Sequence, residues 1–249
     1  MVESRFFVLF AKMRSDSNAD VVKRLLPPFV RRIVHYREID LQLTFSQLKN
    51  ILVDPAAVSK AATFHQQTQG KWARDDPGFL VVLVCSVTIT ALIYFLALEP
   101  FTFFGFFFSI LFAVVHFFVV AVLAASLGKW VATTYLRRPP ALAEAEIEAG
   151  TGAPSSTVEW WYCFDVHCNS FFPYFLLTRI VQFPLLPILY SDSTIGMLLS
   201  LLLFAAAFGY YIYITFLGYF ALPFLHNTEK FLLWYVIFML AFGDSTIFM

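Results

Sequence analysis

One short segment holds residues of the types that bind metals or act as nucleophiles: Cys163, Asp165, His167 and Cys168. Thiolate, imidazole and carboxylate groups are zinc ligands, but a zinc site generally takes four of them at characteristic spacing. The segment offers few at that spacing, so we expect no metal site here and no cofactor. We expect this segment to lead into a membrane span, with Asp165 and His167 forming hydrogen bonds inside a helical bundle.

Two known enzyme motifs have partial counterparts in the chain. The tetrapeptide from Asp165 to Cys168 is similar to the Asp-His-His-Cys motif of membrane palmitoyltransferases. It lacks the second His, and three cysteines in the chain cannot build the cysteine-rich zinc domain that surrounds that motif. Asp192 and Asp244 suggest an intramembrane aspartyl protease, but Asp244 lacks the second glycine of that motif and nothing pairs the two carboxylates. We therefore predict that the chain is not an enzyme.

Arg179 is an ionisable residue near the middle of a long apolar segment. A charge at the centre of a bilayer costs about 2.5 kcal/mol or more, so it must face a partner or a polar cavity. Asp244, Glu99 and His116 are candidate partners. One interpretation is a polar path through a transporter or lipid-handling protein. The other, which we favour, is an internal polar tie between helices.

The densest polar cluster beside an apolar segment contains Trp72, Arg74, Asp75 and Asp76. It could form a docking site or a site for lipid headgroups. It also suits an interfacial tryptophan followed by a helix N-terminus, where carboxylates satisfy exposed amides. We favour the structural interpretation. Glu159 occupies a similar place before the third apolar segment.

These residues must be positioned by membrane-spanning helices, because 59% of the chain is hydrophobic and only 14% is charged. A soluble domain averages about 25% charged residues. About 20 apolar residues cross the hydrocarbon core as a helix. We predict an all-α, polytopic membrane protein, a five-helix transmembrane bundle spanning 79–98, 101–127, 171–190, 195–222 and 231–248, with a cytosolic loop at 129–170.

The basic residues predict the orientation of this bundle. Twelve of the 17 Lys and Arg residues precede residue 79, and four others, Lys129, Arg137, Arg138 and Lys230, fall in segments on the same side. The short turns on the opposite side contain none. By the positive-inside rule the N-terminus is cytosolic, and five spans then place the C-terminus in the lumen.

The region before the first span divides into a variable tail, 1–28, and a cytosolic or interfacial helical region, 29–78. Asp40 can cap a helix that ends before Pro55, and 56–69 is a second helical candidate. The first helix carries an amphipathic stripe of Leu41, Phe45, Leu48 and Leu52. Both helices are expected to lie on the cytosolic membrane face or to pack against the bundle, in contact with membrane lipids.

Three strings of residues together resemble the Unc-fifty family of eukaryotic membrane proteins. They are 72–77, the run from Val158-Glu159-Trp160 to Asp165-Val166-His167, and the tyrosine-rich run 210–225. The resemblance covers about residues 29–235 and keeps the order and spacing of the strings. The chain departs from the family at Arg179, where the family often has a His.

The resemblance implies a five-span protein of the Golgi and other endomembranes that supports secretory and vesicle-mediated protein transport. It implies large Arf guanine-nucleotide exchange factors, recruited to the membrane, or client membrane proteins as partners. Animal members act in the assembly or surface delivery of nicotinic acetylcholine receptors. RNA binding is attributed to a mammalian member, and nothing in this sequence resembles an RNA-recognition motif.

Overall fold

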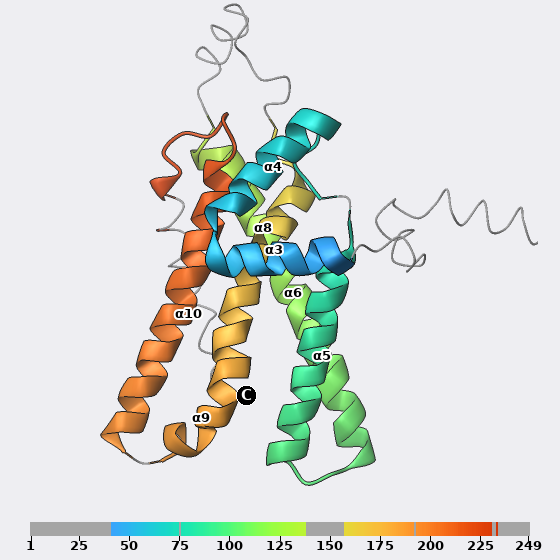
Figure 1. The fold of residues 1–249 in the computed structure, drawn as a ribbon, viewed down its shortest axis with the longest axis vertical. Coiled ribbons are helices and arrows are strands. Elements are labelled where there is room, and N and C mark those ends of the chain that lie inside the picture. The colour runs from blue at the N-terminus through green and yellow to red at the C-terminus, as the bar shows by residue number, and fades with distance from the viewer. Residues whose placement is uncertain (1–40, 75, 138–156, 192, 231–232, 234–249) are drawn as a thin grey trace, which may run out of the picture.

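The computed structural model describes residues 41–74, 76–137, 157–191, 193–230 and 233 (Figure 1). The described part is helical, and it forms no strand beyond an isolated bridge between Arg137 and Leu225. The prediction of an all-α fold is confirmed for the described residues. The predicted fifth span, 231–248, and the tail, 1–28, lie outside the described residues, as do Asp75, Asp192 and Asp244.

Four helical runs are long and apolar enough to cross a membrane: α5 (Gly78–Leu98), α6 (Phe103–Tyr135), Trp160–Leu189 and α10 (Thr194–Phe220). The third run consists of α8 (Trp160–Phe175), the π-helix η2 (Leu176–Val181) and α9 (Gln182–Leu189). The predicted loop, 129–170, is shorter than expected at both ends. Residues 160–170 are helical because their polar side chains find partners inside the bundle.

The helices form two hairpins whose short turns lie at the same end of the molecule (Figure 1). The turn between α5 and α6 spans 99–102, and the turn between α9 and α10 spans 190–193. The C-terminus of α6, the N-terminus of α8 and the C-terminus of α10 gather at the opposite end, which we call the upper end. There the main-chain N–H of His226 donates to the carbonyl of Leu136 at 2.7 Å.

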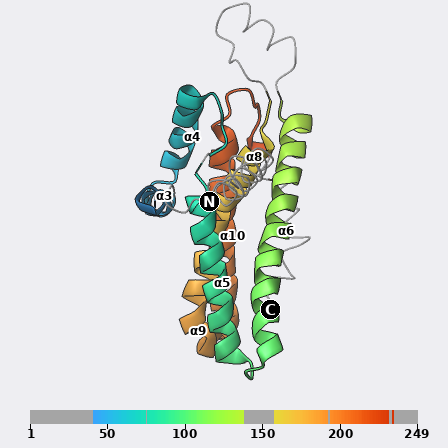
Figure 2. The same cartoon turned by 90° about the vertical axis from the view of Figure 1, so that its right-hand side faces the viewer.

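Two shorter helices cover one side of the upper half. Helix α3 (Leu41–Val53) lies across the long axis of the bundle in Figure 1 and is seen end-on in Figure 2, whereas α4 (Ala56–Gln69) rises toward the upper end. The Tyr210 hydroxyl of α10 donates to the carbonyls of Ile51 and Leu52 at 3.0 and 3.2 Å. This contact fixes the C-terminal end of α3 against the bundle.

The amphipathic stripe predicted for α3 is divided between two environments. The helix buries Thr44, Leu48 and Ile51 against the bundle, so only Leu48 of the predicted stripe is buried. Leu41, Phe45 and Leu52 face outward and are 52%, 60% and 40% exposed. The apolar residues of α3 therefore cover more of its circumference than the bundle contacts. The bundle buries one flank of this apolar face and leaves the other flank exposed.

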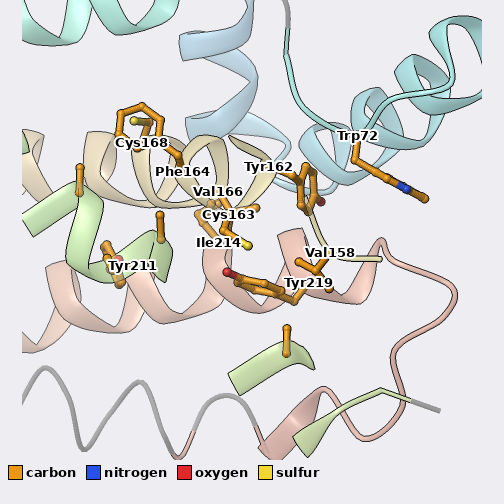
Figure 3. Packing of buried hydrophobic residues seen from close by; sticks show 14 of the residues in the cluster. Trp72, Val158, Tyr162, Cys163, Phe164, Val166, Cys168, Tyr211, Ile214 and Tyr219 are labelled. Atoms are coloured by element: carbon orange, nitrogen blue, oxygen red, sulfur yellow. The ribbon is translucent and has the colours of Figure 1, made fainter. Parts of the chain in front are cut away.

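The core is concentrated where α8 packs between α6 and α10. Apolar side chains gain little by leaving lipid for protein, so small residues that permit close packing decide helix contacts in membranes. Helix α6 buries Ala121, Ala124, Ala125 and Gly128 there. On α10, a Cβ built at Gly218 would lie 2.7 Å from Cγ2 of Val166. Figure 3 shows Cys163, Val166 and Ile214 gathered between α8 and α10.

The π-helix η2 is followed by a proline in the first turn of α9. Within η2 each residue donates to the fifth residue before it, as Gln182 N does to Leu177 O. Pro184 has no N–H, so in the α register of α9 the carbonyl of Ile180 lacks that donor. Helix breaks of this kind are tolerated in membranes when a neighbouring helix satisfies the freed group.

Candidate functional site

Two carboxylates of the third run hold the chain just before the first span. The main-chain N–H groups of Trp72 and Ala73 donate to the two carboxylate oxygens of Glu159, at 3.2 and 3.1 Å. The next N–H, of Arg74, donates to Oδ2 of Asp165 at 2.7 Å. Three consecutive amides are thus satisfied by side chains that lie more than 80 residues away in sequence. The segment 72–74 is thereby docked onto the start of α8.

The side chain of Arg74 joins three helices at this point. Its Nη1 donates to Oε1 of Gln47 on α3 at 2.9 Å, and its Nη2 donates to Oδ1 of Asn169 on α8 at 2.6 Å. Its Cζ lies 4.7 Å from the ring centroid of Phe79 at the start of α5. Such a cation–π contact contributes roughly 0.5–2 kcal/mol. Arg74 therefore positions α3, α5 and α8 relative to one another.

Asp76 and Trp72 have different roles. Asp76 accepts a hydrogen bond from the N–H of Gly78 at 3.0 Å, as expected for a carboxylate at the start of a span. Trp72 does not reach outward as an interfacial anchor, because its side chain is only 4% exposed. Its ring packs edge-on against Tyr162 and Phe224, at centroid distances of 6.0 and 6.2 Å, and Figure 3 shows it beside Tyr162.

A cavity of about 130 Å³ lies between the covering helices α3 and α4 and the bundle helices α8 and α10. Its apolar walls include Val58, Ala61, Val166 and Ile214. Two buried nitrogens of residues that line it, Trp72 Nε1 and His65 Nε2, have no hydrogen-bond partner among the described residues. A buried donor without a partner costs about 1–3 kcal/mol. The polar side chains lining the cavity are Gln47, Asn50, His65, Trp72, Arg74, Asp165 and Asn169.

His167 lies deeper, on the face of α8 that meets α10. It is 2% exposed, and its Nδ1 lies 2.8 Å from the Tyr211 hydroxyl. Its Nε2 is buried without a partner among the described residues. Asp165 and His167 thus form hydrogen bonds inside the bundle, as the sequence predicts. The described residues contain no group of three His, Cys, Asp or Glu side chains that could hold a metal ion.

Arg179 lies against α5 in the middle third of its span. It is the twentieth residue of the 30-residue run Trp160–Leu189, so it lies a little past the middle, toward the turn end. Its Cζ is 5.8 Å from the ring centroid of Tyr94. The Tyr94 hydroxyl donates to the main-chain oxygen of Arg179 at 2.8 Å.

The structure brings together some of the predicted residues and separates others. Trp72, Arg74, Glu159 and Asp165 form one site, whereas His167 and Arg179 lie in separate contacts along the same helical run. Sequence reasoning missed Gln47 and Asn169, which hold the guanidinium of Arg74. Asn169 lies four residues after Asp165, on the same helix face, and that spacing was a usable signal.

Known proteins similar to this chain span several eukaryotic groups. The chain matches the UNC-50 family over residues 29–248. It is 40% identical over 217 residues to "Protein unc-50 homolog" of Dictyostelium discoideum, covering 87% of this chain and 80% of that protein. It is 37% identical to "Protein unc-50" of Caenorhabditis elegans, covering 83% of this chain and 64% of that protein, so it spans less than two thirds of the nematode protein.

A fungal relative gives a similar result. "Protein GMH1 homolog" of Schizosaccharomyces pombe is 34% identical, with 81% of this chain and 83% of that protein covered. No solved structure matches the chain. The family match extends over nearly all of the region that carries the motifs, and four helices in that region can cross a membrane. The chain belongs to the UNC-50 family, the Unc-fifty family indicated by its motifs, and is a multi-pass membrane protein.

Proposed function

We propose that this chain is a non-enzymatic Golgi membrane protein that supports secretory trafficking by recruiting cytosolic factors, such as Arf exchange factors. The observation that carries the proposal is the helix α4 at the upper end of the bundle. None of its 14 residues is buried, and its Phe64 is 68% exposed. An ordered helix that contributes no buried side chain to the core offers its surface to a partner protein.

The distribution of basic residues supports a cytosolic position for that end. Among the described residues, the Lys and Arg side chains other than Arg179 lie in α3, in α4, in the segment 71–74 or in the segments at the upper ends of α6 and α10. The turns at the opposite end, 99–102 and 190–193, have none among their described residues. Positive residues are retained on the cytosolic side, so α4 would face soluble trafficking factors.

Proximity labelling from the N-terminus of the full chain tests the proposal. We expect the labelled set to contain Arf exchange factors or coat components and to lose them in a Phe64→Ser variant. Phe101→Ser is a matched control, because Phe101 is 67% exposed but lies in the turn 99–102 at the opposite end. A labelled set without such factors in the parent chain would contradict the proposed recruitment.

A second candidate function, a transporter or lipid-handling protein with a polar path around Arg179, is favoured by the π-helix at that residue. Single-turn π segments often occur at functional sites. Replacing Arg179 by Gln in the full chain should then abolish a transport or lipid-transfer activity of the reconstituted protein while leaving its expression level unchanged. Under the recruitment proposal the same variant leaves the set of labelled partners unchanged.

A further inference from the structure

The cavity beneath α3 and α4 is lined by two oppositely charged residues, Arg74 and Asp165, whose side chains are not hydrogen-bonded to each other. The guanidinium of Arg74 donates to amide oxygens of Gln47 and Asn169, whereas the carboxylate of Asp165 accepts the main-chain N–H of Arg74. A guanidinium has five N–H donors and a carboxylate about four acceptor positions. Within the described residues each group therefore keeps hydrogen-bonding capacity beside the cavity.

Two further nitrogens belong to residues that line the same cavity. Trp72 Nε1 can only donate a hydrogen bond, and His65 Nε2 can donate in one tautomer. Both are buried without a partner among the described residues. With Arg74 they supply N–H donors for a phosphate, whose bond to a guanidinium is charge-assisted and strong.

Asp165 supplies the complementary charge. It keeps some accessible surface, whereas its neighbours on α8 from Tyr162 to Phe164 and from Val166 to Ser170 are buried. Asp165 lines the cavity, so a cation with N–H groups could donate to it. We infer that the cavity binds a zwitterion with a phosphate and a primary ammonium, the phosphoethanolamine unit, with the phosphate at Trp72 and Arg74 and the ammonium at Asp165.

The volume of the cavity and its level relative to the membrane both fit a phosphoethanolamine headgroup. The volume of about 130 Å³ holds several water molecules, which is the scale of a headgroup and not of a pair of acyl chains. The segment 72–74 comes directly before the first span, and α3 beside it turns apolar side chains outward. Helices of this kind lie at the headgroup level of a membrane. A phospholipid could therefore place its headgroup here with its chains outside.

The same geometry excludes the closest competing headgroups. A quaternary choline ammonium has no N–H and cannot donate to Asp165. A serine headgroup adds a carboxylate that Asp165 would repel. The site should therefore select a primary amine without a second anion. This inference does not depend on the recruitment of trafficking factors.

Native mass spectrometry of the purified full chain with an equimolar mixture of dioleoyl phosphatidylethanolamine, phosphatidylcholine and phosphatidylserine tests the inference. We expect phosphatidylethanolamine to be retained about tenfold over the other two, and a Trp72→Phe variant, which keeps the ring but removes the N–H, to lose about that factor. Asp165→Asn should abolish the preference for the primary amine. Trp161→Phe is the matched control, because Trp161 is exposed on the same helix and does not line the cavity.

Two further arms complete the experiment. In the unmodified chain, successive N-methylation of the phosphatidylethanolamine headgroup should lower retention step by step, so the inference remains testable if a variant fails to fold. Free phosphoethanolamine should displace the lipid if a soluble zwitterion is the ligand, and should fail to displace it if the membrane lipid is. Equal retention of all three lipids, or unchanged selectivity in both Trp72→Phe and Asp165→Asn, would overturn the assignment.

Discussion

The phenol of Tyr94 donates a hydrogen bond to the main-chain oxygen of Arg179, at 2.8 Å, from one membrane span to another. That oxygen belongs to η2, the π segment of the third run. The same tyrosine presents its ring to the Arg179 guanidinium, at 5.8 Å, and packs on Phe183 at 5.1 Å. One residue of α5 thus contacts both the main chain and the side chain of Arg179.

This relationship predicts that the Tyr94 hydroxyl stabilises the bundle. A Tyr94→Phe variant keeps the ring against Arg179 and removes the O–H donor, so it should lose about 1 kcal/mol of unfolding free energy. Unfolding of both proteins in mixed micelles measures the difference. An unchanged free energy of unfolding would show that the hydrogen bond does not contribute to stability.

The close approach of α8 and α10 predicts that Gly218 accepts no larger residue. A Cβ there would lie 2.7 and 2.8 Å from the two γ carbons of Val166, so Gly218→Ala should destabilise the protein by about 1–3 kcal/mol. Truncating the opposing side chain with Val166→Ala should recover part of that loss. Thermal unfolding measures both effects.

Gly209 provides the control on the same helix. A Cβ at Gly209 meets no atom within 4 Å, so Gly209→Ala should leave the unfolding temperature unchanged or raise it slightly, because Ala favours a helix over Gly. If Gly209→Ala and Gly218→Ala lowered the unfolding temperature equally, the loss of stability would not come from a packing contact with Val166. It would then be assigned to the membrane environment.

The contact of Glu159 with the segment 72–74 predicts a large effect from the loss of one charge. Glu159→Gln keeps one acceptor oxygen for two main-chain donors, so the amide of Trp72 or Ala73 loses its partner. We expect a loss of about 1–3 kcal/mol. Hydrogen exchange should accelerate at those two amides. In the control Glu229→Gln, at an exposed site, protection at 72–74 should stay as in the parent chain.

Much of the architecture was predictable because membrane spans leave a strong signal in sequence. Four of the predicted spans coincide with long helices, and their ends shift mainly where polar residues are involved. Asp165 was predicted in the loop 129–170 and lies instead within the helical run Trp160–Leu189, where its carboxylate accepts the Arg74 amide. Such a pair joins residues 91 positions apart and has no local signature in the sequence.

The sequence indicated which residues belong to the candidate site, but it did not predict how those residues contact one another. Trp72, Arg74, Glu159 and Asp165 stood out as polar residues beside apolar segments, but their contacts depend on how α8 packs against the start of α5. Trp72 was expected at the membrane interface and is buried, since Tyr162 and Phe224 enclose its ring. The outward turn of Leu41 and Phe45 depends on which flank of α3 the bundle covers.

Cysteine labelling in sealed Golgi vesicles tests whether the protein is a Golgi multi-pass protein that presents α4 to the cytosol. Thr68→Cys in α4 and Thr102→Cys in the turn at the opposite end are compared in a Cys85→Ala background, because Cys163 and Cys168 are buried. We expect a membrane-impermeant maleimide to label the α4 site in intact vesicles and the turn site only after permeabilisation. Labelling in the reverse order, or a tagged chain absent from Golgi membranes, would contradict it.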